Sequence, residues 1–542
     1  MAGQNKGIPE RRDVWRLWLE RLAPFAVFAF KLAVSAIYLR YYLPRFTRLM
    51  YIADGPARGI EAYRLAYGGF ELFPTHQFLP MQLWLWAGLL KIYPDIYWTG
   101  TALNVAAAAG TTVLLYLLGR ELAGPVAGAV AAILFIFSPV HHFLTLSEGM
   151  AESIFFFWNA AGIYLASRAA REGRGAWAAG LCFGAAALTR YESAALLILY
   201  SGYRLFRARP RGVGGWLLWA APVAVVAVLV GHKATVAAHQ GVWTDLAGVK
   251  ADSEVILPHA AWFERVFYGL TRVWRDGRIF GLLGVCGAFL VWTRAYRTEN
   301  RLLIWSGLVA LAVGVLGVFG IVGLGFGPER HFSIVLMLLF AFAGLTVVAV
   351  WRWARRIVPK IVFAILLMAA VTDTARFDRC IRDYGYGARG PYDSSLTAAA
   401  EVALVLRDLW RNGDLKPDEN VMVESGEPGA TGVWRWEEYA IRAYSDHPLN
   451  FLRERRPSLT EKLPRLLPFM RNNEIRVAIV TSDRNRERIQ WYYDEICTAA
   501  VVYENPTQTV VVLREGWDKV PDFASRERRD LVTVYDCAPD NL

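Results

Sequence analysis

Long apolar stretches alternate with short polar segments from Leu22 to about Val371, and this pattern then stops. A bilayer core is crossed by about 20 helical residues. The pattern therefore predicts a polytopic α-helical membrane protein with about eleven spans. The predicted spans are 22–42, 96–118, 124–140, 150–167, 175–189, 193–206, 213–231, 279–292, 302–323, 332–350 and 357–371.

After Thr374 the pattern changes to shorter alternating elements, which indicate a soluble α/β domain with a partly parallel sheet. The predicted domains are therefore 1–373, the transmembrane domain, and 374–542, a soluble domain outside the cytoplasm. Predicted helices cover SSLTAAAEVALVLRDLWRNG, WRWEEYAIRAY, LTEKLPRLLPFMRNN and NRERIQWYYDEI, and predicted strands cover VMVES, IRVAIVTS, AAVVYE and TVVVLRE.

Composition agrees with the membrane class, because 55% of the residues are apolar and the mean hydropathy is +0.28. The net charge of +11 does not indicate nucleic-acid binding, since the arginines lie in short clusters between apolar segments. The positive-inside rule places most of these clusters in the cytoplasm. We therefore expect a protein of the cytoplasmic (plasma) membrane, with the active site and the C-terminal domain facing outward, toward the periplasm.

The first outer loop, residues 51–95, is predicted to form a helical cap, with one helix at 60–67 and an interfacial helix in PMQLWLWAGLLKIY. Asp54 and Glu61 are seven residues apart in this loop. The glycines and proline between them argue against one continuous helix, so Asp54 is expected in a turn.

A second polar element is the turn Thr189-Arg190-Tyr191-Glu192, between two apolar segments of only about 15 residues. Such segments span roughly 22 Å of a core of ~30 Å, so the turn should lie below the outer membrane surface. Charges at this depth either line a polar cavity or pair with each other. Both alternatives remain open for Arg190 and Glu192.

The order of these features resembles the GT-C glycosyltransferases, in the branch that uses polyprenyl-phosphate sugars. That branch includes protein O-mannosyltransferases and the aminoarabinose transferases of lipid A. The resemblance covers roughly residues 22–350 and rests on the acidic first outer loop with IEAYRLA, followed by YLLGRELAG, SEGMAESIFFFW, AALTRYESAALLI and GFGPERHF.

The resemblance implies that an acid of the first outer loop is the catalytic base, either Asp54 or Glu61. It gives Glu148 a role in acceptor positioning or metal binding, although Glu148 could equally cap a helix. It makes Arg330 a candidate for the donor phosphate, with His331 where the family usually has Tyr. The expected substrate-binding residues are Arg45, Arg58, Glu148, Arg190, Glu192, Arg330 and His331.

The implied reaction is transfer of a sugar, with inversion, from a polyprenyl-monophosphate donor to a hydroxyl of a lipid, glycan or protein acceptor at the outer face. The partners are this donor, the acceptor and membrane lipids, with no nucleic acid. No cofactor is required, while a divalent metal is compatible with the site through the weak candidates His142 and Glu148. The alternative is a non-enzymatic lipid or glycan transporter with an outer binding domain, although we detect no internal repeat of the kind many transporters have.

Overall fold

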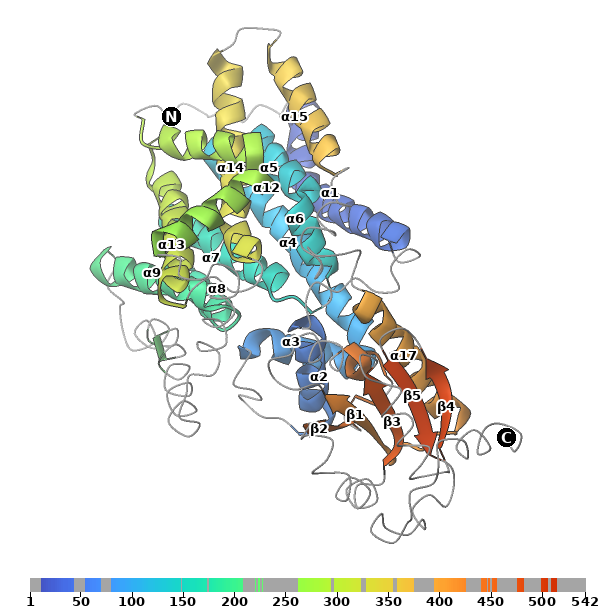
Figure 1. Cartoon of the computed structure of the whole chain (residues 1–542). Helices are drawn as coiled ribbons and strands as arrows, with labels where there is room; N and C mark the ends of the chain where they lie inside the picture. Colours follow the sequence, from blue (N-terminus) through green and yellow to red (C-terminus); the bar gives the residue numbers. More distant parts are fainter. Residues whose placement is uncertain are drawn as a thin grey trace, which may run out of the picture. The chain divides into compact units, whose positions relative to one another are not determined.

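The structure is a computed structural model (Figure 1). It describes residues 11–42, 54–69, 79–147, 149–172, 175–207, 262–293, 297–322, 328–353, 358–374, 394–425, 440–445, 447–448, 451–455, 475–481, 499–504 and 508–513, with four isolated positions between 220 and 227. The chain divides into two compact units. The first comprises 1–41, 71–85 and 101–381, and the second comprises 42–70, 86–100 and 382–542.

The first unit is helical, and its helices follow the predicted apolar segments. Their bounds are α1 (Arg11–Tyr42), α4 (Ile96–Ala123), α5 (Pro125–Phe137), α6 (Pro139–Leu146), α7 (Glu152–Glu172), α8 (Ala176–Ala187), the 3₁₀ helix η1 (Tyr191–Ser193), α9 (Ala194–Arg207), α12 (Trp262–Leu290), α13 (Glu299–Val322), α14 (Pro328–Trp353) and α15 (Val358–Thr374). The predicted span at 213–231 lies outside the described residues apart from isolated positions.

Among the described helices, four are long and apolar enough to cross a membrane. These segments are Arg21–Arg40, Ile96–Ala123, Glu299–Leu316 and Arg330–Trp353. A fifth span results if α5 and α6 are counted together, and shorter apolar helices occur at Ala176–Ala187, Gly277–Leu290 and Lys360–Ala370. These helices identify an integral membrane protein, and the number of eleven spans stays a prediction.

The predicted span 124–140 is broken in the structure. Helix α5 ends at Phe137, Ser138 is extended, and α6 begins at Pro139 after a bend of 60°. Proline explains the break, because its ring disfavours a helical conformation for the preceding residue while fitting the first turn of the next helix. The break turns α6 away from the axis of α5 and carries two histidines into the bundle.

Glycines allow several of these helices to pack with their backbones in contact. A side chain at Gly128 of α5 would meet the carbonyl oxygen of Tyr116 of α4, and one at Gly344 of α14 would meet that of Ala127 of α5. Small residues are the usual solution for close helix contacts in membranes, where packing replaces the hydrophobic effect as the driving force. Helix α14, whose apolar side chains are almost all buried, is consequently the centre of the bundle.

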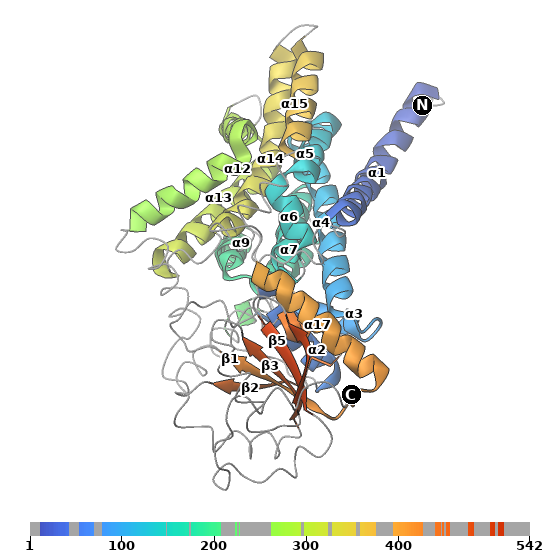
Figure 2. The same cartoon turned by 45° about the vertical axis from the view of Figure 1, so that its right-hand side comes forward.

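The second unit contains a five-stranded sheet in the order β2-β1-β3-β5-β4, with α17 (Ser394–Asn412) against β5 (Figure 2). The strands are β1 (Asn420–Ser425), β2 (Phe451–Arg455), β3 (Ile475–Thr481), β4 (Ala499–Glu504) and β5 (Gln508–Leu513). Strand β1 pairs in parallel with β2 and β3, while β5 pairs antiparallel with β3 and β4. The partly parallel sheet and four of its strands were predicted, whereas β2 was not, because FLRER is a mostly charged edge strand.

The same unit contains α2 (Asp54–Tyr67), and here the sequence prediction was wrong. Helix α2 runs through Gly55, Pro56 and Gly59 without interruption, so Asp54 begins a helix instead of lying in a separate turn. Proline is tolerated in a first turn. Gly59 is required by packing, because a side chain there would collide with Ile96 and crowd Trp86.

Helix α3 (Pro80–Leu90) confirms the helix predicted in PMQLWLWAGLLKIY, and it contributes residues to both units. Its Trp86 is fully buried and donates a hydrogen bond from Nε1 to Thr99 Oγ1 at 2.9 Å. Tyr67 of α2 donates to the Leu90 carbonyl at 2.7 Å. These contacts fix α2 beside the end of α3 and the start of α4.

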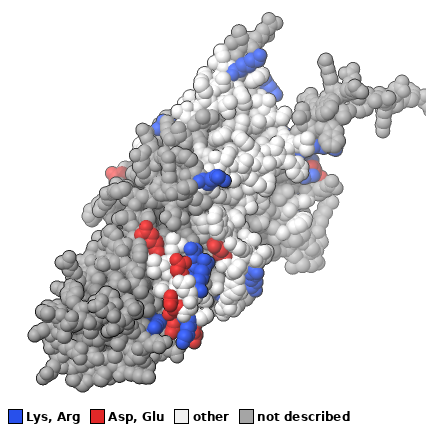
Figure 3. Space-filling model, turned by 90° about the vertical axis from the view of Figure 1, so that its right-hand side faces the viewer, with Lys and Arg blue, Asp and Glu red and all other residues white. Residues whose placement is uncertain are grey.

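Large apolar side chains are exposed on several helices of the first unit. Phe25, Ile37, Phe289 and Met368 are each 64% exposed or more. The face shown in Figure 3 has broad areas without Lys, Arg, Asp or Glu among the described residues. Exposed apolar side chains on membrane-length helices are expected to contact lipid.

Glycine packing at the centre of the bundle generates a stability prediction. Gly344→Ala should destabilise the protein by about 1 to 3 kcal/mol, because the new Cβ meets the backbone of α5, which cannot rotate away. Gly202→Ala is the matched control, since a side chain at that helical glycine meets no atom within 4 Å. Thermal unfolding in detergent measures both, and equal melting temperatures for the two variants would contradict the packing argument.

Candidate functional site

Arg190 lies at the centre of a buried polar cluster in the first unit. The residue has an extended backbone (φ −153°, ψ 143°) between the end of α8 and the start of η1. This conformation ends α8 and turns the chain back into α9. The guanidinium group is therefore presented from a turn, as the sequence predicted for this segment.

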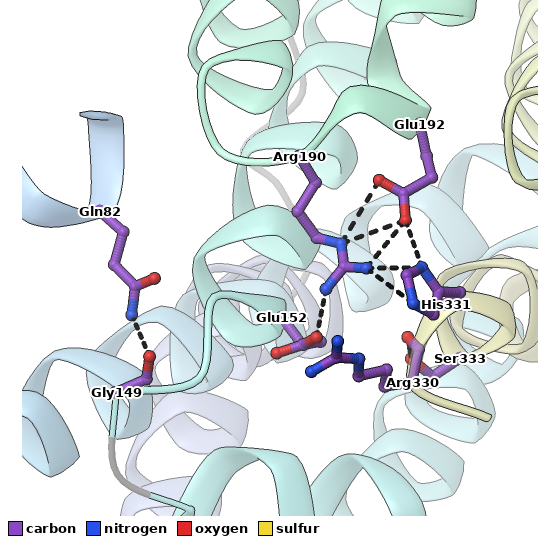
Figure 4. A network of polar contacts seen from close by, with 8 residues as sticks. All are labelled: Gln82, Gly149, Glu152, Arg190, Glu192, Arg330, His331 and Ser333. Atoms are coloured by element: carbon purple, nitrogen blue, oxygen red, sulfur yellow. Dashed lines mark hydrogen bonds and ion pairs between the residues drawn. The ribbon is translucent and has the colours of Figure 1, made fainter. Parts of the chain in front are cut away.

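Three side chains surround the guanidinium group of Arg190 (Figure 4). Its Nη1 donates to Oε1 of Glu152, the first residue of α7. Its Nη2 donates to Oε1 of Glu192 at 2.9 Å, and its Nε donates to the same oxygen at 3.2 Å. His331, from the first turn of α14, has its Nδ1 2.6 Å from Nη2.

The cluster is almost completely withdrawn from solvent. Side-chain exposure is 10% for Arg190, 0% for Glu152 and 3% for Glu192. Arg190 and His331 both contact the Glu192 carboxylate. The guanidinium group is held between the two carboxylates of Glu152 and Glu192.

His331 contacts both charged groups through one ring nitrogen. Nδ1 lies 2.7 Å from Oε1 of Glu192 as well as 2.6 Å from Nη2 of Arg190. A carboxylate only accepts and a guanidinium only donates. With the proton on Nδ1, the imidazole donates to Glu192 Oε1, whereas without it Nδ1 accepts from Arg190 Nη2. In either tautomer His331 lies against both charged groups and bonds one of them.

Arg330 precedes His331 in the first turn of α14 and adds a second guanidinium group to the cluster. Its positive charge acts on both Arg190 and His331. Two arginines and two glutamates, with a neutral imidazole, give the cluster a balanced formal charge. The N-terminus of α14 adds a partial positive charge at the same place.

Backbone contacts from α13 and α3 support this arrangement. A side chain at Gly314 of α13 would collide with the carbonyl oxygen of Glu192, so only glycine allows α13 to approach η1 this closely. The amide of Met81 donates to the Leu188 carbonyl at 3.2 Å, just before the Arg190 turn. Gln82 donates to the Gly149 carbonyl at 2.6 Å, just before α7 (Figure 4).

The structure brings together four of the residues predicted from the sequence, namely Arg190, Glu192, Arg330 and His331. Glu61 and Arg58 lie on α2 in the second unit, where Glu61 pairs with Arg64 at 3.4 Å. Asp54 is the first residue of that helix. Arg45 and Glu148 lie outside the described residues.

Sequence reasoning did not assign Glu152 to this cluster. The available signal was an acid inside a predicted span, which is costly in lipid unless it has a partner. The partner is 38 residues away in sequence, so the pattern could not identify it.

A metal site was a weaker prediction, with His142 and Glu148 as candidates. His142 is buried beside Lys31, whose Nζ lies 3.2 Å from Nδ1. In the part of the chain that the structure describes, no three His, Cys, Asp or Glu side chains are grouped so that they could hold a metal ion.

The buried ion pairs generate a prediction about stability. Arg190→Met should cost roughly 3 to 5 kcal/mol, because Glu152 and Glu192 would lose their cation while remaining buried. Arg168→Met is the control, since Arg168 is 49% exposed and its partner Glu172 is 28% exposed. Unfolding of both variants in detergent checks the difference, and a loss of under ~1 kcal/mol for Arg190→Met would contradict it.

Residues 75–232 match the protein family described as dolichyl-phosphate-mannose-protein mannosyltransferase. No curated protein matches the chain.

The fold is similar to that of ArnT from Cupriavidus metallidurans in two solved structures. The structure bound to undecaprenyl phosphate has a TM-score of 0.55 at 12% identity, over 93% of this chain and 98% of that chain. The apo structure has a TM-score of 0.52 at 14% identity, over 92% and 98%.

A more distant similarity is to the archaeal oligosaccharyltransferase AglB from Archaeoglobus fulgidus in complex with an inhibitory peptide and a dolichol-phosphate. Here the TM-score is 0.47 at 12% identity, over 95% of this chain and 77% of that chain. The family match and the ArnT fold confirm the resemblance that the sequence motifs predicted. Residues 75–232 thus match a mannosyltransferase family, and the fold of the chain is similar to that of ArnT.

Proposed function

We propose that the protein transfers a sugar from a polyprenyl-monophosphate donor to an acceptor hydroxyl at the outer face of the plasma membrane. The observation that carries this proposal is the buried cluster around Arg190 and Arg330, inside a bundle of membrane-length helices. Lipid-embedded phosphate is the anion that reaches such a depth. The similar fold of ArnT bound to undecaprenyl phosphate supports the same donor class.

Arg330 is the residue of the cluster best suited to contact the donor phosphate. The Nε, Nη1 and Nη2 of Arg190 already donate to Glu152 and Glu192, so a phosphate there would compete with two carboxylates. Arg330 lies in the first turn of α14, where the helix dipole also favours an anion. Arg190 then organises the cluster, and Arg45 remains a second candidate for the phosphate.

The acceptor must lose a proton as it attacks, and α2 carries both candidate bases. Asp54 and Glu61 stand two turns apart on this one helix. The Glu61 side chain is 26% exposed, so it is reachable from solvent. It also forms an ion pair with Arg64. We keep both carboxylates as candidates for the general base.

In the proposed step, the acceptor oxygen attacks the anomeric carbon from the face opposite the phosphate. The bond between that carbon and the phosphate oxygen breaks, and the polyprenyl phosphate leaves with the bonding electron pair. The acceptor proton passes to Asp54 or Glu61. This single displacement inverts the anomeric configuration, and it requires no metal because a lipid monophosphate carries less charge than a nucleotide diphosphate.

Removing both candidate bases should abolish transfer, because an unassisted hydroxyl is a poor nucleophile. General-base catalysis contributes about 10²- to 10⁴-fold, so Asp54→Asn or Glu61→Gln should lose that much activity, depending on which residue is the base. The assay uses radiolabelled polyprenyl-phosphate mannose and membranes containing an acceptor. Glu401→Gln, on α17, is the control. Full activity in both α2 variants would refute the base assignment.

Loss of the phosphate-binding arginine should weaken donor binding. A charge-assisted hydrogen bond contributes on the order of 1.5 to 3 kcal/mol, so Arg330→Ala should raise the Kd for undecaprenyl phosphate roughly ten- to over a hundredfold. Arg45→Ala and Arg190→Ala are measured beside it, after a check that each variant folds in detergent. Arg168→Ala, an exposed residue paired with Glu172, should leave the Kd unchanged.

An unchanged Kd in Arg45→Ala, Arg190→Ala and Arg330→Ala would refute the lipid-phosphate donor. Vesicles that move a lipid-linked sugar across the bilayer without forming a glycosidic product would favour a transporter instead.

A further inference from the structure

Helix α6 is held by polar bonds on two of its sides, although it lies within the membrane bundle. All of its described residues after Pro139 are buried, including His141, His142 and Thr145. Polar side chains in such a place are costly unless each has a partner. Thr145 bonds the His141 carbonyl of its own helix, whereas the two histidines also reach partners on α1 and α14, which are far from α6 in sequence.

His141 is bonded through both ring nitrogens. Its Nε2 lies 2.9 Å from the carbonyl oxygen of Ser333, and its Nδ1 lies 2.7 Å from Oγ of Ser138. A carbonyl only accepts, so Nε2 carries the proton and Nδ1 accepts from the serine hydroxyl. Both bonds are satisfied by one neutral tautomer, and the ring has no rotational freedom left.

Aromatic rings surround the same imidazole. The centroids of Phe135, Phe156 and Phe340 lie 4.8, 5.3 and 5.5 Å from that of His141. These rings exclude water from the hydrogen bond to Ser333, and a hydrogen bond is electrostatically stronger in such surroundings than in water.

The opposite contact of α6 runs through His142 to α1. Lys31 is fully buried in the first span, with its Nζ 3.2 Å from Nδ1 of His142 and 5.5 Å from the centre of the Phe135 ring. Helix α6 is therefore fixed to α1 as well as to α14.

The bond to Ser333 reaches the second turn of α14, directly after the turn that carries Arg330 and His331. Ser333 is two residues from His331 and three from Arg330, and its hydroxyl donates to the Arg330 carbonyl at 2.5 Å. At its other end α6 leads to Ser147, whose carbonyl accepts from Asn104 at 2.9 Å, and then to Glu152 at the start of α7. One rigid short helix thus connects two segments that supply the Arg190 cluster.

We propose that His141 is a positioning residue that holds the first turn of α14, and so the side chains of Arg330 and His331, where the donor phosphate binds. The expected effect on donor binding rests on the proposed function. The expected effect on the position of α14 does not depend on that function. The proton stays on Nε2 throughout, and His141 takes no part in the chemistry.

Two measurements on the full-length protein in nanodiscs test this role. His141→Phe keeps the ring and removes both hydrogen bonds, whereas His141→Gln retains an amide N–H that can reach the Ser333 carbonyl. We expect His141→Phe to raise the Kd for undecaprenyl phosphate about tenfold and to speed hydrogen exchange in residues 328–340. His141→Gln should have a Kd and an exchange rate close to those of the unmodified protein. The double variant His141→Phe with Arg330→Ala should have the same Kd as Arg330→Ala alone.

Thr112→Val is the matched control, because Thr112 is equally buried and bonds only the Ala108 carbonyl of its own helix, at 2.8 Å. If His141→Phe does not fold, His141→Asn, which is too short to reach Ser333, carries the same expectation.

A folded His141→Phe protein with unchanged Kd, where Arg330→Ala raises the Kd, would overturn the positioning role and leave the proposed donor site standing. An unchanged Kd in both variants would instead overturn the donor assignment to Arg330. Additive losses in the double variant would also contradict positioning through Arg330.

Discussion

The pairing of Arg190 with two buried carboxylates is the interaction on which the site depends. Burying a single guanidinium inside a helical bundle costs free energy, and this cost is offset only when carboxylates balance its charge and accept hydrogen bonds from its N–H groups. Glu152 and Glu192 meet them from α7 and η1, and His331 approaches from α14. Any displacement of one of these helices would leave a buried charge without its partner, so the ion pairs fix three elements together.

Glycines allow the helices that carry these ion pairs to approach one another closely. The close approach of α13 to the Glu192 carbonyl and of α14 to α5 both need a residue without a side chain. Close backbone packing and buried ion pairs thus act on the same helices. The first sets the distances between them, and the second selects a single register, because guanidinium and carboxylate groups bond well only over a narrow range of geometry.

The sequence predicted the helical segments well, because hydrophobic periodicity and span length are local properties. It also predicted that the Arg190 turn would place charges below the membrane surface, where they either line a polar cavity or pair with each other. The structure shows the pair between Arg190 and Glu192. It could not identify Glu152 as the partner, because a contact between residues 38 positions apart depends on how α7 and α8 pack. Lys31 escaped notice for the same reason, as its partner lies on α6.

The wrong prediction for α2 has a different origin. A glycine in a helix costs only about 1 kcal/mol relative to alanine, which a buried contact easily offsets. A Cβ at Gly59 would collide with Cγ2 of Ile96 and lie 3.1 Å from the Trp86 ring, so a side chain there would force these two residues to move. The glycine that suggested a break is therefore the residue that lets the helix pack. Strand β2 shows the reverse case, since its edge position tolerates charges that mask a strand pattern.

Charge balance in the cluster suits the proposed chemistry. Arg190 and Arg330 are offset by Glu152 and Glu192, so with a neutral His331 the cluster has no formal net charge. A sugar-bearing lipid phosphate is a diester with one negative charge, whereas the departing monoester carries close to two at neutral pH. Negative charge therefore grows on the phosphate as the sugar leaves, next to Arg330 and the N-terminus of α14. N–H groups that are already fixed in place stabilise this growing charge more than they stabilise the bound lipid-phosphate sugar. This difference between transition state and bound substrate is what lowers the reaction barrier.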